Sequence, residues 1–334
     1  MINILFYCPF RFDLKSKNLS KLGGIESLNI DLCNELSKKK FKIYLASFCN
    51  KEIKKNGVIN IPIKKILNKN NKKKFDIIVS SNDPNIFDNF KTTKKILWMH
   101  NTLSIEKSIR KKKFISILKN KISVVFVSNY LKTKTSNLYL FNKKTVINNF
   151  LSKKFSRSKP NFNRNKIIVW SVQREKGLDD TIKMWKKHIY PINNKIKFYI
   201  FGVNKNIYQQ KIKKLNKYTI FFYGRVAKEK LRTVYNKSLA MICLGYDETF
   251  CLNALEANAS GLPILTFGKT ALKDYSINNS NSYILGNFNE LAKKVISISN
   301  NHIDKKMILS SIKNTKKYQI NKIVKLWINL LKRT

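Results

Sequence analysis

Two glutamates stand eight positions apart in a segment that passes from a strand pattern into a helical one. Glu248 lies in the loop where the helix is expected to start, and Glu256 lies about two turns inside that helix. The N–H groups at a helix start donate to phosphate or hydroxyl oxygens. A carboxylate accepts hydrogen bonds from two adjacent hydroxyls, as ribose or a sugar offers. The spacing fits a sugar-phosphate ligand, and it fits equally a helix-capping acid followed by a lysine-paired surface acid.

The surrounding pattern predicts the elements that hold this segment. Apolar β-rich runs alternate with helical periodicity, which is typical of parallel α/β sheets. We expect strands at Ile2–Tyr7, Lys42–Ser47, Asp76–Ser80, Lys95–Met99, Ser123–Ser128, Thr145–Ile147, Lys166–Ser171, Lys197–Phe201, Thr219–Tyr223, Leu239–Leu244 and Pro263–Phe267. We expect helices at Ile25–Leu36, Leu178–His188, Ile207–Asn216, Lys228–Lys237, Thr249–Ala259, Asn289–Ser297 and about Ile303–Leu331. Ligands of such sheets bind beyond the carboxyl ends of the strands.

A polar stretch divides the chain in two. Residues 152–165 contain Pro160, lack periodicity and are expected to be an interdomain linker. We therefore predict two Rossmann-like doubly wound domains, at 1–155 and 156–315, followed by a helix at 316–334 that returns to the first domain.

The segment with the two glutamates resembles the E-x7-E donor motif of the retaining glycosyltransferases of family 4, the group 1 transferases with the GT-B fold. The residues in register are Glu248, Phe250, Leu252, Glu256, Ala257, Ala259, Gly261 and Pro263. The resemblance implies two Rossmann-like domains that face each other across a cleft. It also implies that Glu256 holds the ribose hydroxyls and Glu248 the hydroxyls of the donor sugar, while the amides of Phe250, Cys251 and Leu252 line the sugar and phosphate.

Softer matches to the same family lie in the first half. Gly23 and Gly24 follow the first strand, as does the family's glycine-rich loop, and they would let the backbone approach a diphosphate. A tight turn explains them as well. His100 ends a strand and resembles the family's histidine beside the donor sugar, although a lone histidine also occurs as a satisfied polar residue.

In the second half, Lys176 matches the family lysine that meets the donor pyrophosphate. The position of the family arginine holds Trp170 or Ser171, and Arg174 is either its substitute or a solvated arginine. The loop that contains Arg225 resembles the family's loop near the nucleobase.

Metal and cofactor sites are not expected. The chain contains no D-x-D triplet, and its three histidines are far apart in sequence, so the spacing predicts no metal ligands. The donor would be a nucleotide diphosphate sugar used without a cofactor. The family implies front-face transfer with retention, in which no protein group acts as the nucleophile and positioning carries the rate.

The net charge of +48 comes almost entirely from lysine, since only eight of the 67 basic residues are arginine. Lysine, asparagine and isoleucine are in excess together, which favours coding bias over a dedicated phosphate-binding surface. We therefore expect no specific nucleic-acid partner. A basic nucleic-acid-binding protein on a degenerate transferase scaffold stays an alternative, as does a GT-B sugar-nucleotide epimerase or a phosphorylase.

Location and acceptor follow less directly from the sequence. The start of the chain lacks the features of a signal peptide, and five cysteines without a CxxC pair indicate reduced core thiols, so we expect a cytoplasmic protein. Residues 104–121 predict a basic amphipathic helix, either an ordinary surface helix or one that rests on an anionic membrane. In the second case the protein would bind peripherally to the inner face of the cytoplasmic membrane. The family implies a saccharide or lipid-linked acceptor and a part in surface polysaccharide or lipopolysaccharide synthesis.

Overall fold

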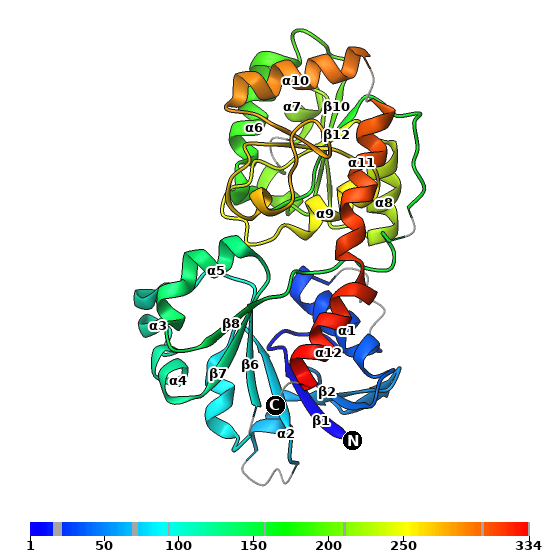
Figure 1. Cartoon of the computed structure of the whole chain (residues 1–334). Helices are drawn as coiled ribbons and strands as arrows, with labels where there is room; N and C mark the ends of the chain where they lie inside the picture. The colour runs from blue at the N-terminus through cyan, green and yellow to red at the C-terminus, as the bar shows by residue number, and fades with distance from the viewer. Residues whose placement is uncertain are drawn as a thin grey trace. The chain divides into compact units, whose positions relative to one another are not determined.

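The computed structural model describes residues 1–15, 22–68, 73–92, 94–156, 158–209, 212–301 and 304–332. The chain forms two compact units (Figure 1): Met1–Phe150 together with Ile320–Thr334, and Leu151–Gln319. The sequence predicted boundaries after residues 155 and 315. Among the described residues, no helix is both long enough and apolar enough to cross a membrane.

The first unit is built on an eight-stranded sheet in the order β3-β4-β2-β1-β5-β6-β7-β8. All neighbouring strands are parallel except β3 and β4. The strands are β1 (Ile2–Tyr7), β2 (Phe41–Ser47), β3 (Ile53–Lys55), β4 (Val58–Pro62), β5 (Ile77–Ser81), β6 (Lys94–Met99), β7 (Ile122–Phe126) and β8 (Lys143–Val146). Continuous apolar runs such as Ile4–Phe6 are buried because helices cover both faces of a parallel sheet.

The helical elements of this unit are α1 (Gly24–Leu36), α2 (Ile63–Leu67), η2 (Pro84–Asn89), α3 (Ile105–Arg110), α4 (Phe114–Lys119), α5 (Asn129–Thr135), η3 (Ser136–Tyr139) and α12 (Ile320–Lys332). Helix α12 carries apolar residues on one face, and its Trp327 is fully buried. The ring centroid of Trp327 lies 4.9 Å from that of Trp98 in β6. This packing anchors the end of the chain to the sheet of the first unit.

The single helix predicted over 104–121 is wrong. The chain forms two six-residue helices, α3 and α4, because Lys112 between them adopts a left-handed φ of 53° that no α-helix can contain. The helix predicted over about 303–331 is also interrupted, since its described part consists of α11 (Lys305–Thr315), η8 (Lys316–Tyr318) and α12. In both cases apolar periodicity continued through a break in the backbone.

The second unit contains a six-stranded parallel sheet in the order β11-β10-β9-β12-β13-β14. The strands are β9 (Ile167–Trp170), β10 (Lys197–Phe201), β11 (Ile220–Gly224), β12 (Ala240–Ile242), β13 (Ile264–Thr266) and β14 (Ser282–Ile284). The helical elements are η4 (Arg174–Lys176), α6 (Leu178–Met184), η5 (Trp185–Ile189), η6 (Lys205–Tyr208), α7 (Ile212–Asn216), α8 (Lys228–Lys237), α9 (Leu252–Ala259), η7 (Thr270–Asp274), α10 (Phe288–Asn301), α11 and η8.

The stretch expected to be a linker belongs to the second unit. Phe155 is 1% exposed, and its ring centroid lies 6.2 Å from that of Tyr235 in α8. Arg164 is also buried. These two buried side chains pack the stretch against the rest of the second unit. The polar composition of the stretch gave no sign of this packing.

Candidate functional site

The strand order of the second unit reverses between β9 and β12. The chain runs outward from β9 through β10 to β11 and returns to the other side of β9 as β12. In open α/β sheets, ligands bind at such a switch point, beyond the carboxyl ends of the two strands. The loop after β9 carries Arg174 and Lys176, and the loop after β12 carries Glu248.

Lys176 connects the two loops. Its ammonium group donates a hydrogen bond to the carbonyl oxygen of Asp247, and the same charge acts on the neighbouring carboxylate of Glu248. The structure therefore brings together two residues that lie 72 positions apart and belong to different sequence motifs. A cation beside a carboxylate suits a ligand that joins a sugar to a phosphate, because the carboxylate can accept hydrogen bonds from hydroxyls.

Glu248 is unusually easy to protonate. Burial raises the pKa of its carboxyl group from 4.5 to about 7, while Lys176 acts in the opposite direction and Asp247 raises the pKa further. The pKa rises because the desolvation of the charged carboxylate costs more free energy than its Coulomb attraction to Lys176 returns. A perturbed carboxyl group at a switch point marks a functional-site candidate.

Glu256 lies inside α9 and is 2% exposed. Its Oε1 atom accepts a hydrogen bond of 2.7 Å from the Nζ atom of Lys228, the first residue of α8. A fifth of the Lys228 side chain reaches solvent. No sequence motif marks Lys228, because only the packing of α8 on α9 brings it to the carboxylate.

The helix that carries Glu256 begins later than predicted, at Leu252 rather than Thr249. Cys251 caps it with a left-handed backbone, φ 62° and ψ 75°. Phe250 before it is buried, and its ring centroid lies 5.8 Å from those of Tyr275 and Tyr318. This aromatic cluster fixes the turn, so the N-terminus of α9 follows directly after the loop of Glu248.

The two arginines selected from the sequence are Arg174 and Arg225. Arg174 forms an ion pair with Asp179, with its Nη2 atom 2.8 Å from Oδ2, and its guanidinium stands 5.5 Å from the ring centre of Tyr208. Arg225 is exposed in the loop after the edge strand β11. Lys176, and not Arg174, is therefore the cation beside Glu248.

The remaining selected residues lie in the first unit. Gly23 caps α1 with an ordinary φ of −67°, and Gly24 is the first residue of that helix. His100 follows β6, is 4% exposed and packs on the ring of Trp98 at 4.5 Å between centroids. Burial lowers the pKa of His100 to about 3, so its imidazole is neutral. It can accept or donate a hydrogen bond but carries no charge.

Gly177 holds the loop of Lys176 in place. Its φ is +101°, and an added Cβ atom would lie 2.6 Å from Cδ1 of Leu244 and 3.0 Å from the ring of Tyr246. We predict that Gly177→Ala lowers the free energy of unfolding by about 2–4 kcal/mol and weakens donor binding, because strain and overpacking add. Urea unfolding measures the first effect and donor titration the second.

Gly202→Ala is the matched control for this substitution. Its φ is +76°, but an added Cβ atom would meet only the carbonyl oxygen of Ser171, at 3.7 Å. We expect about 1–2 kcal/mol of backbone strain there. Equal losses in both variants would contradict a tight contact of Gly177 with the loop after β12.

The raised pKa of Glu248 predicts a pH-dependent stability. Because the folded state holds this proton up to about pH 7 and the unfolded state only to 4.5, the wild type loses stability as pH rises through that interval. Glu248→Gln removes this loss. In EDTA, we expect the free energy of unfolding of the variant, relative to wild type, to gain about 2–3 kcal/mol between about pH 5 and about pH 8. Urea titrations at both values measure it, and a pH-independent difference would contradict the shift.

The sequence and the fold were compared with those of known proteins. Residues 152–318 match the family described as glycosyl transferases group 1. Sucrose-phosphate synthase from Thermosynechococcus elongatus is similar in structure, with a TM-score of 0.77, 13% identity and coverage of 99% of this chain and 98% of that protein. A glycosyltransferase from Rickettsia africae gives a TM-score of 0.73 at 16% identity, covering 100% of this chain and 99% of the other.

Anabaena Alr3699/HepE, solved in complex with UDP and glucose, also has a TM-score of 0.73, with 14% identity and full coverage of both chains. At identities this low, the structural similarity shows only that the fold is shared. A search of curated proteins gave no match to this sequence.

Proposed function

This chain belongs to the glycosyl transferases group 1 family and is a glycosyltransferase with the GT-B fold, and from this premise we propose that it uses a nucleotide diphosphate sugar as donor. The observation that carries the proposal is the meeting of Lys176 and Glu248 at the β9–β12 switch point, directly before the helix of Glu256. The UDP and glucose held by Anabaena HepE support a donor of this class.

We propose a role in donor binding for each site residue of the second unit. Glu256 binds the ribose hydroxyls, Glu248 binds hydroxyls of the donor sugar, and the backbone amides of Phe250, Cys251 and Leu252 line the sugar and phosphate. Lys176 neutralises the charge that develops on the departing nucleoside diphosphate. Arg174 and Arg225 line the outer part of the donor site, where Arg174 must leave Asp179 to reach a phosphate.

We propose that His100, as a neutral imidazole, exchanges a hydrogen bond with the donor sugar, and that Gly23 and Gly24 border the diphosphate. Transfer then occurs on the front face with retention and without a metal ion, because the lysine and the helix amides supply the positive charge. The acceptor is a saccharide or a lipid-linked saccharide of a surface polysaccharide or lipopolysaccharide.

The release of nucleoside diphosphate from UDP-, GDP- and ADP-sugars in EDTA tests this proposal. One donor should be turned over in the presence of a saccharide acceptor pool, at a rate unchanged by EDTA, and NMR of the product should show the anomeric configuration of the donor. Turnover that requires added Mg²⁺, or an inverted product, would contradict the mechanism.

We further propose that the first unit binds an anionic membrane through α3 and α4. Ile109, Ile115 and Leu118 expose more than half of their side chains, and Arg110 and Lys111 beside them are also exposed. Apolar side chains among basic ones are typical of a surface that inserts shallowly between lipid headgroups. Such binding would keep a cytoplasmic enzyme at the membrane face, where lipid-linked acceptors lie.

Liposome sedimentation tests the membrane proposal. Each basic residue at an anionic surface contributes about 1 kcal/mol, so reversing the charge of Arg110 and Lys111 to Glu should weaken vesicle binding by at least about 30-fold. The same change at the exposed Lys213 and Lys214 of α7 is the control and should have little effect. Binding that persists without anionic lipid would contradict the proposal.

A further inference from the structure

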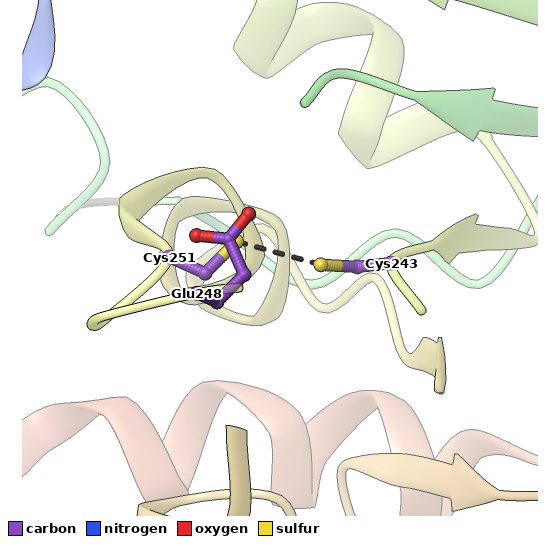
Figure 2. Close-up of side chains that lie close together, drawn as sticks. All are labelled: Cys243, Glu248 and Cys251. Atoms are coloured by element: carbon purple, nitrogen blue, oxygen red, sulfur yellow. Dashed lines mark hydrogen bonds between the residues drawn. The ribbon is translucent and has the colours of Figure 1, made fainter. Parts of the chain in front are cut away.

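Three potential metal ligands meet at the start of α9. Cys243 directly follows β12, Cys251 caps α9, and their sulfur atoms lie 3.5 Å apart. One ligand atom from each cysteine and one carboxylate oxygen of Glu248 all lie within 4.8 Å of one another. Figure 2 shows the two sulfur atoms facing each other, with Glu248 next to Cys251.

The backbone at Cys251 is held in a conformation that side chains rarely adopt. Its φ of 62° and ψ of 75° lie in the left-handed region, which costs a non-glycine residue about 1–2 kcal/mol. The hydroxyl group of Tyr275 donates a hydrogen bond of 3.0 Å to its carbonyl oxygen and helps to hold it there. A strained residue whose sulfur points to a second buried sulfur is the kind of outlier that accompanies ligand sites.

The geometry suits a soft divalent cation. Two sulfurs on a tetrahedral zinc ion, with Zn–S distances of about 2.3 Å, lie about 3.8 Å apart, close to the separation of Cys243 and Cys251. Thiolates select Zn²⁺ or Cd²⁺ over Mg²⁺ and Ca²⁺, which prefer oxygen. Glu248 is partly exposed and gives the site a side open to solvent, where water can complete the coordination.

The charges also balance. Binding displaces the two thiol protons to solvent, so two thiolates and one carboxylate face a dication and leave one net negative charge. The ammonium group of Lys176, which already acts on Glu248, offsets that charge. A buried cation site without such compensation would be costly.

We propose that Cys243, Cys251 and Glu248 form a site for a soft divalent cation of the Zn²⁺ class, and that its occupation inhibits the enzyme. The inhibition rests on the proposed function, because a Glu248 carboxylate that binds the cation cannot bind hydroxyls of the donor sugar. The cation is thus a competitor of the donor and takes no part in transfer.

Titration of the reduced full-length chain with Cd²⁺ tests the site directly. One equivalent should produce the ultraviolet charge-transfer band of a cadmium thiolate. Cys243→Ser and Cys251→Ser should each weaken Cd²⁺ binding by about 100-fold or more and Glu248→Gln by about 10-fold or more. Cys49→Ser removes the half-buried thiol of the first unit and should leave the titration unchanged. No band, or a band that survives loss of either Cys243 or Cys251, would overturn the proposal.

X-ray absorption of the zinc-loaded wild type avoids dependence on the variants. It should show two sulfur ligands per zinc, completed by oxygen or nitrogen, and a zinc ion without sulfur ligands would overturn the site.

At a Zn²⁺ concentration ten times its dissociation constant, competition should raise the apparent dissociation constant of the donor about 10-fold. An unchanged donor affinity would refute the inhibition. Transfer measured in EDTA tests the proposed function separately.

Discussion

Replacing Glu256 by glutamine should lower kcat/KM for donor turnover by at least about 100-fold, because each hydrogen bond from a hydroxyl group of the proposed donor to the carboxylate would contribute about 1.5–3 kcal/mol. Glu256 is 2% exposed, so little water can reach its side chain to replace a lost hydrogen bond. The amide has nearly the same shape, but its single acceptor oxygen faces the ammonium group of Lys228, and an NH2 donor replaces the second carboxylate oxygen. Steady-state kinetics with the preferred donor in EDTA measure the effect.

Glu229→Gln is the matched control for this substitution. Glu229 follows Lys228 in α8 and pairs with Lys154, but both side chains of that pair are at least 40% exposed. Exposed pairs contribute little, so we expect near-wild-type turnover and stability. Near-wild-type kcat/KM in Glu256→Gln itself, with folding intact, would show that α9 does not hold the donor.

Replacing Arg164 by methionine destabilises the second unit by about 3–5 kcal/mol, because the substitution leaves several buried carbonyl groups without their donor. Arg164 is 7% exposed, and its guanidinium group forms hydrogen bonds with three separate segments of the chain. It donates to the carbonyl oxygens of Asn161, Tyr235, Ser238, Ser260 and Gly261. Burial lowers its pKa to about 10, which still leaves it charged at neutral pH.

Arg232→Met is the control for this prediction. Arg232 lies in α8 and donates one hydrogen bond, 2.6 Å long, to the carbonyl oxygen of Lys154. Its loss should cost no more than about 1.5 kcal/mol. Urea unfolding, followed by circular dichroism, compares the two variants. Equal losses would mean that the network around Arg164 contributes no more than a single bond.

The alternation of apolar runs was enough to predict the parallel α/β fold, because buried parallel strands are continuous apolar runs. It did not predict the hairpin of β3 and β4. Asn56 and Gly57 between them have positive φ values of 51° and 78°, as the tight hairpin turn of an Asn-Gly pair requires. That dipeptide was visible in the sequence, so this element could have been predicted. Helix breaks, in contrast, depended on single backbone angles such as that of Lys112.

The site was only partly visible in the sequence. Glu248 and Glu256 could be selected because they lie in a motif with a fixed spacing, and Lys176 because a second segment resembles the family's lysine loop. Lys228 could not, since its contact with Glu256 depends on how two helices pack. The pairing of Cys243 with Cys251 was hidden for a similar reason, because a strand end and a helix start meet only after the intervening loop folds back.

Calorimetric unfolding of the wild type and of Glu256→Gln with UDP-, GDP-, ADP- and CMP-sugars, in EDTA, tests the central claim most directly. One nucleotide diphosphate sugar should stabilise the wild type by about 2.7 kcal/mol at 100 times its dissociation constant, and the variant much less. If no donor stabilises the wild type, or if the variant is stabilised equally, Glu256 and its neighbours do not form the donor site.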